Sequence, residues 1–347
     1  MSKNFKKIIS LLLILCILTM SCSCSETPAK EYEVVGQVVD GAGRTLDVRS
    51  DAKDATIASV YFVAAPFFVA LDIADRVVAV NARNHFWTDA NSDLAAAGTV
   101  GKGVVDLEKL ASYHPTALVH RSNDPETIEA VSKLGIDVIC ITVENADDVI
   151  NTLNLLGTYF GVPENAERAI SWFNEKLDYI DNIVSQIPES EKKTAMLIGG
   201  DLGRVAGCDM LQSWMIEKAG GIPIVQEGVN HNWVDIGTEK VFTYNPDVIF
   251  CTSSAARSYK VEDVLNDKVW SSLAAVQNGQ MYDIPTTLDS WDMPGLSCVL
   301  GTMFMLHEMY PDYLSVSDLE DQVDDYYRFM FGRCFDKELD LDWDNFK

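Results

Sequence analysis

The sequence predicts an α/β protein with two Rossmann-like lobes. We expect parallel sheets, one long rigid α-helix joining the lobes, and a ligand cleft between them. Short apolar strands alternate with helical segments before residue 162 and again after residue 188. This alternation is typical of a parallel sheet covered by helices on both faces. The chain has 347 residues, of which 48% are hydrophobic, and this is enough for two packed cores.

Residues 162–188 are predicted to form the connecting helix. Apolar residues such as Ala169 and Phe173 recur at spacings of three and four, which marks one face of a helix. Pro163 suits the first helical turn, and Pro188 ends the run. At 1.5 Å per residue the helix would be roughly 35 Å long. We therefore expect a rigid strut between the lobes; the alternative is one more surface helix of a single domain.

The N-terminus is predicted to be a lipoprotein signal peptide, residues 1–22. Lysines near the start precede an apolar run at 8–20, which is shorter than the roughly 20 residues of a membrane-spanning helix. Small residues then lead to Cys22, the expected lipidation site, with Cys24 as the alternative. An ordinary cleaved signal or a single membrane anchor is the other reading. Residues 23–31 are expected to form a polar tether.

The first lobe is predicted over residues 32–161. It begins with an alternating segment around Asp-Gly-Ala-Gly at 40–43, which indicates a β-hairpin. A polar loop is expected at 81–88. The expected strands are 57–63, 76–80, 117–120 and 136–142, and the expected helices are 67–74, 104–110, 125–134 and 146–160.

The second lobe is predicted over residues 189–347 with the same alternation. Ligands of such sheets bind at the loops beyond the carboxyl ends of the strands. The expected strands are 193–198, 222–225, 248–251 and 280–284, and the expected helices are 210–219, 238–243, 261–265, 270–273, 296–310 and 319–331.

Charge and cysteine content exclude several kinds of partner. The formal net charge of -25 argues against nucleic acid and against an anionic membrane surface. The cysteines after Cys24 are scattered and form no C-x-x-C pair, so no zinc or redox site is expected. The five histidines have no close ligand spacing, so no metal site is predicted. They are His85, His114, His120, His231 and His307.

Several segments of the chain, taken in order, form a recognisable series. In the first lobe the segment is Leu-Gly-Ile-Asp-Val at 134–138. In the second lobe the segments are Lys-Ala-Gly-Gly-Ile-Pro at 218–223, Glu239 followed by Tyr-Asn-Pro-Asp-Val-Ile-Phe at 244–250, Trp-Ser-Ser-Leu-Ala-Ala-Val-Gln-Asn-Gly at 270–279, and Leu-His-Glu-Met-Tyr-Pro-Asp at 306–312. Together they resemble the helical-backbone class of ABC-transporter substrate-binding proteins, which capture ferric siderophores, haem and cobalamin. The order and spacing of the segments make the resemblance specific over most of the mature chain.

The resemblance implies an extracytoplasmic lipoprotein that binds an iron–chelate, such as a ferric siderophore, or a related metal-containing ligand. The protein would deliver this ligand to an ABC-transporter permease. Receptors for haem, cobalamin, molybdate or tungstate are alternatives within the class. We expect a monomer that reaches the membrane only through its lipid anchor and has no cofactor of its own, the Fe, Co or Mo belonging to the ligand. A secreted α/β enzyme is the remote alternative, since the sequence shows no nucleophile elbow, phosphate loop or His-Glu-x-x-His helix.

The resemblance also implies docking on the permease through one carboxylate in each lobe. Glu239 matches this position in the second lobe; the alternative is an ordinary exposed helix charge. In the first lobe the position falls at Pro66, which carries no charge. We therefore expect first-lobe docking either to use another acid, such as Asp72, or to be asymmetric.

Polar and aromatic side chains follow the predicted strand ends of both lobes. Arginine donates paired hydrogen bonds to carboxylates and oxyanions, and tryptophan offers a flat apolar wall for a large cyclic ligand. For haem, His85 or His231 would be the axial ligand. For each candidate, loop packing or a surface ion pair is the alternative role. The predicted ligand-binding residues are Asn84, His85, Trp87, Arg121, Ser122, Arg204, His231, Trp233, Ser253, Arg257 and Trp291.

Overall fold

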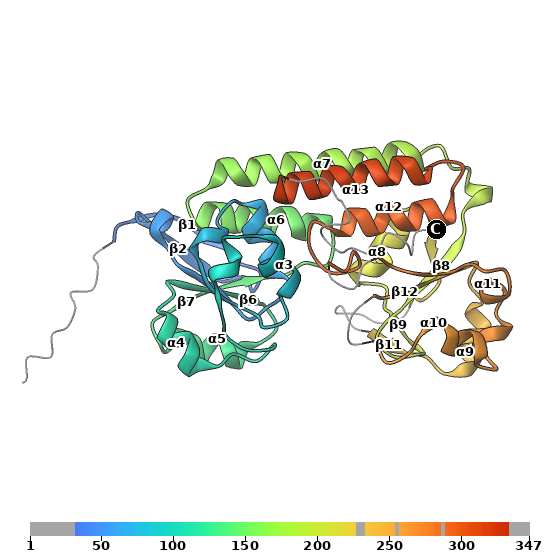
Figure 1. The fold of residues 1–347 in the computed structure, drawn as a ribbon, viewed down its shortest axis with the longest axis horizontal. Coiled ribbons are helices and arrows are strands. Elements are labelled where there is room, and N and C mark those ends of the chain that lie inside the picture. Colours follow the sequence, from blue (N-terminus) through green and yellow to red (C-terminus); the bar gives the residue numbers. More distant parts are fainter. Residues whose placement is uncertain (1–31, 227–232, 254–256, 286–288, 333–347) are drawn as a thin grey trace, which may run out of the picture.

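The computed structural model describes residues 32–226, 233–253, 257–285 and 289–332. These residues form two lobes with a layer of long helices along one side (Figure 1). α7 (Pro163–Val184) runs along that layer from one lobe to the other. The expected architecture of two α/β lobes joined by one long helix is therefore confirmed. Within the described ranges, no helix combines the length and the apolar character needed to cross a membrane.

In the described chain the first lobe contains a sheet of five parallel strands in the order β5-β4-β3-β6-β7. The central strand β3 is buried along its whole length, as a parallel strand covered on both faces must be. The strands are β3 (Ile57–Ser59), β4 (Val77–Val80), β5 (Gly98–Thr99), β6 (Ala117–Arg121) and β7 (Asp137–Ile141). The α-helices are α2 (Ala64–Ala70), α3 (His85–Ala90), α4 (Leu107–Tyr113), α5 (Pro125–Ser132) and α6 (Ala146–Tyr159), and the 3₁₀ turns are η1 (Ala52–Asp54), η2 (Ala74–Arg76) and η3 (Leu94–Ala96).

A β-hairpin precedes this sheet and covers its β7 edge. Asp40 in the hairpin turn forms a 2.6 Å ion pair with Arg44, and the Gly41 N–H donates to the carbonyl of Cys140 in β7 at 2.7 Å. The turn therefore supplies partners to a sheet edge that would otherwise be open. The two antiparallel strands are β1 (Val34–Val39) and β2 (Thr45–Arg49).

The sheet of the second lobe has, among the described residues, the order β11-β9-β8-β12-β13, with β10 paired to β8. β8, β10, β12 and β13 are parallel as expected, whereas β9 and β11 are short antiparallel strands that the sequence analysis did not predict. The strands are β8 (Thr194–Ile198), β9 (Arg204–Ala206), β10 (Ile222–Pro223), β11 (Trp233–Asp235), β12 (Val248–Cys251) and β13 (Met281–Asp283). The helices are α8 (Leu211–Lys218), α9 (Thr238–Tyr244), α10 (Val261–Asn266), α11 (Ala274–Gln277), α12 (Cys298–Met309) and α13 (Val316–Phe331), with 3₁₀ turns η4 (Glu189–Glu191) and η5 (Trp270–Ser272).

Two local expectations in the first lobe need correction. The strand expected over 57–63 ends at Ser59, because the Ser59 hydroxyl bonds to both the N–H and the carbonyl of Tyr61, at 3.1 and 3.0 Å. Such a local side chain–backbone turn competes with continued strand pairing. The loop expected over 81–88 instead contains the start of α3, which buries two aromatic side chains against the core.

α7 and α13 are held together by an aromatic stack and by an ion pair between a buried lysine and a partly exposed aspartate. Trp172 of α7 stacks on Phe329 of α13 with ring centroids 4.8 Å apart, and its indole N–H donates to Asp325 at 2.8 Å. The buried ammonium of Lys176 lies 2.8 Å from the same carboxylate. Burial would raise the pKa of Asp325, but hydrogen bonds from Lys176 and Trp172 lower it. The buried lysine charge is therefore compensated, as burial requires.

The carboxyl-terminal end of α13 reaches the first lobe. The ring of Phe331 lies 5.5 Å from that of Trp87 and 5.9 Å from that of Phe86, measured between centroids. Tyr327 lies 6.4 Å from Phe86 in an edge-to-face arrangement. One apolar core therefore continues through both lobes and the helices that bridge them.

We predict that Trp172→Ala lowers the free energy of unfolding by about 3 kcal/mol, because it removes the stack on Phe329 and the hydrogen bond to Asp325. Trp172→Phe keeps a ring and is expected to lose only about 1 kcal/mol. Urea denaturation measures both variants. Unchanged stability of Trp172→Ala would show that this contact does not hold α13 on α7.

A buried carboxylate lies at the same junction. Asp289 accepts a hydrogen bond from the Tyr327 hydroxyl at 3.2 Å, and the indole N–H of Trp291 donates to that hydroxyl at 3.2 Å. Burial raises the pKa of Asp289 to about 7, although hydrogen bonds from Tyr327 and Tyr326 oppose the rise. The charged carboxylate is therefore disfavoured in the folded protein.

This carboxylate predicts a pH-dependent stability. The unfolded chain gives Asp a pKa near 4, so the folded protein binds an extra proton between about pH 4 and pH 7 and loses stability as the pH rises through that range. A pKa difference of this size corresponds to about 4 kcal/mol. We expect Asp289→Asn to melt at a higher temperature than the wild type at pH 8 and at a similar temperature at pH 4. The exposed Asp312→Asn is the control, and a wild-type advantage over Asp289→Asn at pH 8 would contradict the prediction.

Candidate functional site

The loops that follow the strands of one sheet contact the loops that follow the strands of the other. The backbone N–H of Leu211, at the start of α8, donates to the Glu144 carboxylate beyond β7 at 3.4 Å. A Cβ added at Gly295, before α12, would lie 3.6 Å from Cγ of Pro66 in α2. The carboxyl ends of the two sheets therefore flank the boundary between the lobes, and we take this boundary as the candidate site.

Two aromatic side chains that the sequence analysis missed follow the central strand β3. Tyr61 is half-buried and Phe62 is exposed, and their rings meet edge to face with centroids 6.2 Å apart. Burial raises the pKa of the Tyr61 hydroxyl; the Glu144 carboxylate adds to the rise and Arg121 opposes it. Tyr61 is therefore an uncharged aromatic donor beside the lobe boundary. An aromatic pair directly after a buried strand was the signal available in the sequence.

In the second lobe, Trp233 lies where the strand β8 ends, as Tyr61 and Phe62 lie where β3 ends in the first lobe. Its ring covers the backbone of Gly199, just beyond β8, so closely that a Cβ added there would lie 2.6 Å from the ring. The absence of a side chain at Gly199 lets the indole lie against the strand end. Arg204 pairs across the β9–β11 ladder with Asp235, and both side chains are exposed.

The predicted residues at the end of β6 contact partners in their own lobe. The Ser122 hydroxyl lies 2.7 Å from that of Thr142 beyond β7. The Arg121 guanidinium donates to Asp124 at 3.1 Å. Both side chains lie at the strand ends as predicted.

The predicted residues beyond β12 belong to a similar local network. The Ser253 hydroxyl lies 2.6 Å from that of Ser290, which donates to the buried Asp292 at 2.6 Å. Burial raises the pKa of Asp292, although a hydrogen bond from Ser290 opposes the rise. Arg257 forms an ion pair with Asp283 at the end of β13.

Two tryptophans predicted to line the cleft lie in the apolar core instead. Trp291 is fully buried and bonds to Tyr327, and Trp87 packs against Phe331. The cause is a contact with a segment that is distant in the sequence. α13, near the end of the described chain, packs over both rings. Neither side chain is placed to form a cleft wall.

The remaining predicted positions have different surroundings. Asn84 is buried and donates to the carbonyl of Phe62 at 3.0 Å, so it holds the loop that carries the aromatic pair. His85 is exposed at the start of α3. His231 and Cys22 lie outside the described residues. In the part of the chain that the structure describes, no group of three or more His, Cys, Asp or Glu side chains is arranged to hold a metal ion.

The docking candidate Glu239 has a first-lobe counterpart that the sequence analysis missed. Leu-Glu-Lys-Leu-Ala-Ser-Tyr-His-Pro at 107–115 corresponds to Thr-Glu-Lys-Val-Phe-Thr-Tyr-Asn-Pro at 238–246. This internal repeat aligns Glu108 with Glu239, and it was readable in the sequence. A search for similarity between the lobes would have found it.

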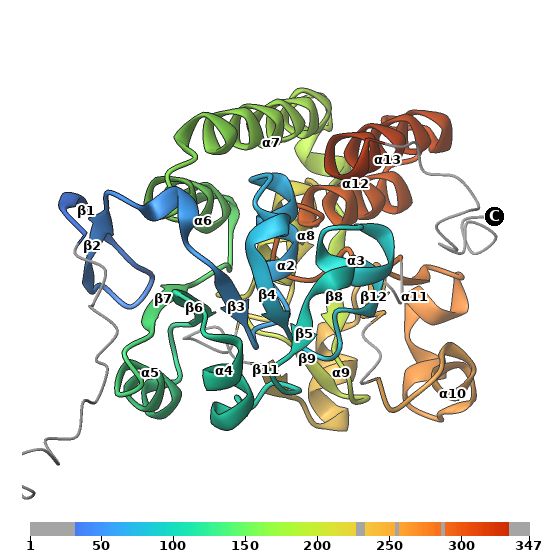
Figure 2. The same ribbon diagram turned by 60° about the vertical axis from the view of Figure 1, so that its left-hand side comes forward.

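The structure supports the repeat. α4 and α9 each have seven residues, and each is followed by a residue in the left-handed region, His114 with φ 49 and Asn245 with φ 34. Glu108 and Glu239 are both exposed. Figures 1 and 2 show α4 and α9 on the same side of the molecule, opposite α7.

Neither Pro66 nor Asp72, the first-lobe positions considered in the sequence analysis, lies on α4 beside Glu108. Pro66 is buried in α2. Asp72 follows Leu71, whose carbonyl accepts a hydrogen bond from Asn165 of α7 at 2.8 Å. Asp72 therefore lies near α7, away from α4 and α9.

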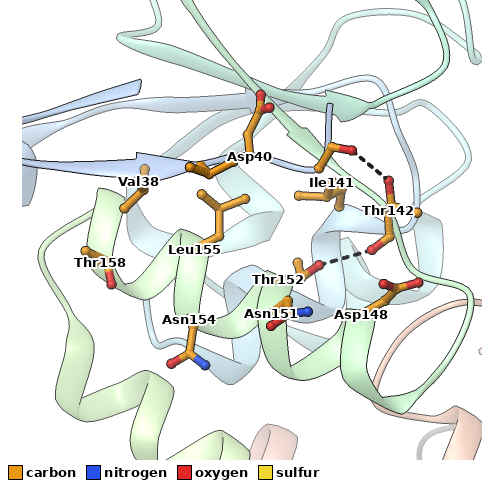
Figure 3. Close-up of a pocket in the computed structure, with 12 residues that line it drawn as sticks. Val38, Asp40, Ile141, Thr142, Asp148, Asn151, Thr152, Asn154, Leu155 and Thr158 are labelled. Carbon is orange, nitrogen blue, oxygen red and sulfur yellow. Dashed lines mark hydrogen bonds between the residues drawn. The ribbon is translucent and has the colours of Figure 1, made fainter. Parts of the chain in front are cut away.

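A groove of about 510 Å³ lies between the hairpin and α6 (Figure 3). Val38 and Asp40 line it from the hairpin, Thr142 from beyond β7, and Asn151 and Leu155 from α6. Every lining residue precedes α7 in the chain. The groove is therefore formed by the first lobe alone.

Comparisons with known proteins agree with this architecture. Residues 57–288 match the family model described as periplasmic binding protein. The molybdate-binding protein MolA of Haemophilus influenzae is 21% identical over 255 residues, which cover 67% of this chain and 71% of MolA.

Solved structures show the same fold. A periplasmic solute-binding protein from Veillonella parvula matches with a TM-score of 0.73 and 23% identity, covering 90% of this chain and 98% of that one. CeuE of Helicobacter pylori in its Ni-His complex matches with a TM-score of 0.74 and 20% identity, covering 89% of this chain and 98% of CeuE. Because the family model spans well over half of the sequence, the chain belongs to the periplasmic binding protein family, whose members act outside the cytoplasm, bind solutes for ABC importers, carry no cofactor and are not enzymes.

Proposed function

We propose that this protein is a lipoprotein receptor that binds a metal-containing chelate between its lobes and delivers it to an ABC-transporter permease. The aromatic side chains Tyr61 and Phe62, just beyond β3, and Trp233, whose ring lies against Gly199 just beyond β8, carry this proposal. Aromatic faces bury the surface of a large ligand and leave its polar groups to a few placed donors. A ferric siderophore is our first choice, with haem and cobalamin as alternatives. Cys22 is the proposed lipid anchor.

An oxyanion receptor is the second candidate. The relative MolA is named as a molybdate-binding protein, and this favours the same ligand class here. A small oxyanion needs a compact site with several charged or strongly polar donors. Aromatic side chains at the strand ends of both lobes support a larger ligand better.

We predict that Trp233 reports ligand binding. Saturable quenching of tryptophan fluorescence by a ferric siderophore should disappear largely in Trp233→Phe, because the indole lies at the strand end. Trp233→Ala is expected to weaken binding about tenfold, through the loss of an aromatic contact of about 1.4 kcal/mol.

The control is Trp270→Phe, which alters a buried tryptophan of the second lobe's own core. Quenching of equal size in the wild type and in Trp233→Phe would place the ligand away from Trp233. An absorbing ligand also requires correction for the inner-filter effect.

We further propose that Glu108 and Glu239 dock the loaded protein on basic residues of the permease. Charge reversal at either position, Glu108→Arg or Glu239→Arg, is predicted to lower the stimulation of importer ATPase activity in proteoliposomes at least about tenfold, since like charges across an interface repel. Ligand affinity should not change, because both side chains lie on helices outside the lobe boundary.

Glu189→Arg is the matched control, since it reverses an exposed charge in η4, just beyond α7. Normal stimulation by the Glu108→Arg and Glu239→Arg double variant would contradict docking through these acids. A selective defect in Glu239→Arg alone would instead support asymmetric docking.

A further inference from the structure

Exposed apolar side chains lie beside both proposed docking glutamates. In α9, Phe242 comes three residues after Glu239 and is 51% exposed. Residues three apart are neighbours on the surface of a helix, so the ring and the carboxylate lie side by side. In the first lobe, the exposed Leu107 immediately precedes Glu108 at the start of α4. A charged and an apolar side chain therefore occur together in each half of the repeat.

A second apolar side chain lies close to Glu108. Val104, two residues before the N-cap of α4, is 79% exposed, the highest value among the large hydrophobic residues of the described chain. Four residues of extended chain span at most about 14 Å. A protein–protein interface of ordinary size, about 800 Å² on each partner, therefore covers Val104 and Glu108 together.

The loop that carries Val104 is held by backbone hydrogen bonds. The carbonyl of Gly101 accepts from the Ala82 N–H at 2.8 Å, and the Asp106 N–H donates to the carbonyl of Val100 at 2.9 Å. Gly101 has φ 134, and a Cβ added there would lie 1.9 Å from the carbonyl oxygen of Val104. The turn therefore requires glycine at this position. A fixed loop presents its exposed valine at a low entropy cost to binding.

The repeat keeps the glutamate but not the apolar side chains. Phe242 of α9 aligns with Ala111 of α4, which is too small to act as an anchor. The exposed apolar surface of the first lobe comes instead from Val104 and Leu107, around the start of α4. The two lobes therefore present the same charge but different apolar shapes to a partner. Large aromatic side chains in such positions contribute most of the binding energy at many interfaces.

Resting on the proposed docking through Glu108 and Glu239, we propose that Phe242 and Val104 are apolar anchors that insert into pockets beside basic side chains of the permease. Charge complementarity with the glutamates selects this partner. Figures 1 and 2 show α4 and α9 on the same side of the molecule, so one partner surface reaches both. The glutamates steer the encounter, and the unequal anchors determine which lobe contacts which half of the permease.

The test is the concentration dependence of importer ATPase stimulation in proteoliposomes. Phe242→Ser is expected to weaken docking about tenfold, Val104→Ser about threefold, and Phe242→Leu less than Phe242→Ser, because Leu keeps an apolar side chain. Val39→Ser is the matched control, since Val39 is 65% exposed in β1, away from α4 and α9. All four positions are exposed or largely so, and thermal melting checks that each variant is folded.

Salt separates the anchors from the glutamates. Raising NaCl from about 0.05 M to about 0.5 M shortens the screening length to about 4 Å. The docking defect of Glu239→Arg should therefore shrink at high salt, because it is electrostatic. The defect of Phe242→Ser should persist, because the loss of an apolar contact is not screened.

Four outcomes count against the proposal. Normal docking of Phe242→Ser and Val104→Ser at both salt concentrations overturns the anchors, and a defect of Glu239→Arg in the same assay leaves docking through the acids standing. Weaker ligand binding by either serine variant assigns the side chain to the ligand site and also overturns the inference. Binding of the unlipidated wild type, but not of Phe242→Ser, to protein-free liposomes assigns the anchors to the bilayer. Absence of stimulation by the wild type overturns the proposed function itself.

Discussion

The structure depends on the apolar contact between α13 and the first lobe. α7 joins the lobes covalently, but one helix alone would leave their relative orientation free to vary. The stack of Trp172 on Phe329 and the packing of Phe331 against Trp87 add a second bridge. Because a close-packed core tolerates little displacement, the strand ends of both sheets are held at fixed positions. We therefore propose that the candidate site at the lobe boundary is largely formed before a ligand arrives.

Most of the fold could be predicted because its signals are local. The spacing of apolar residues in α7 and the apolar strands bounded by polar turns are readable from neighbouring residues. The short strands β9 and β11 were not predicted, since three residues carry too little periodicity. The equivalence of Glu108 and Glu239 was also readable, but only by comparing one lobe with the other.

The site was less predictable because its geometry is set by distant segments. Trp87, Trp233 and Trp291 all follow predicted strands, yet only Trp233 lies at a strand end with its ring partly exposed. α13 covers Trp87 and Trp291, and the sequence next to these two residues does not indicate that contact. The pairing of Arg257 with Asp283 is similarly non-local, since it joins the ends of β12 and β13. Residue type and strand position predict which side chains lie near the boundary. They do not predict which of these side chains form ion pairs or hydrogen bonds within their own lobe.

Differential scanning calorimetry of the mature, unlipidated protein tests the shared core most directly and needs no ligand. If one core holds both lobes, they unfold together, and we predict a single transition whose calorimetric and van't Hoff enthalpies agree. Two separate transitions, one for each lobe, would contradict the account, because the lobes would then be independent units and the lobe boundary would not be preformed.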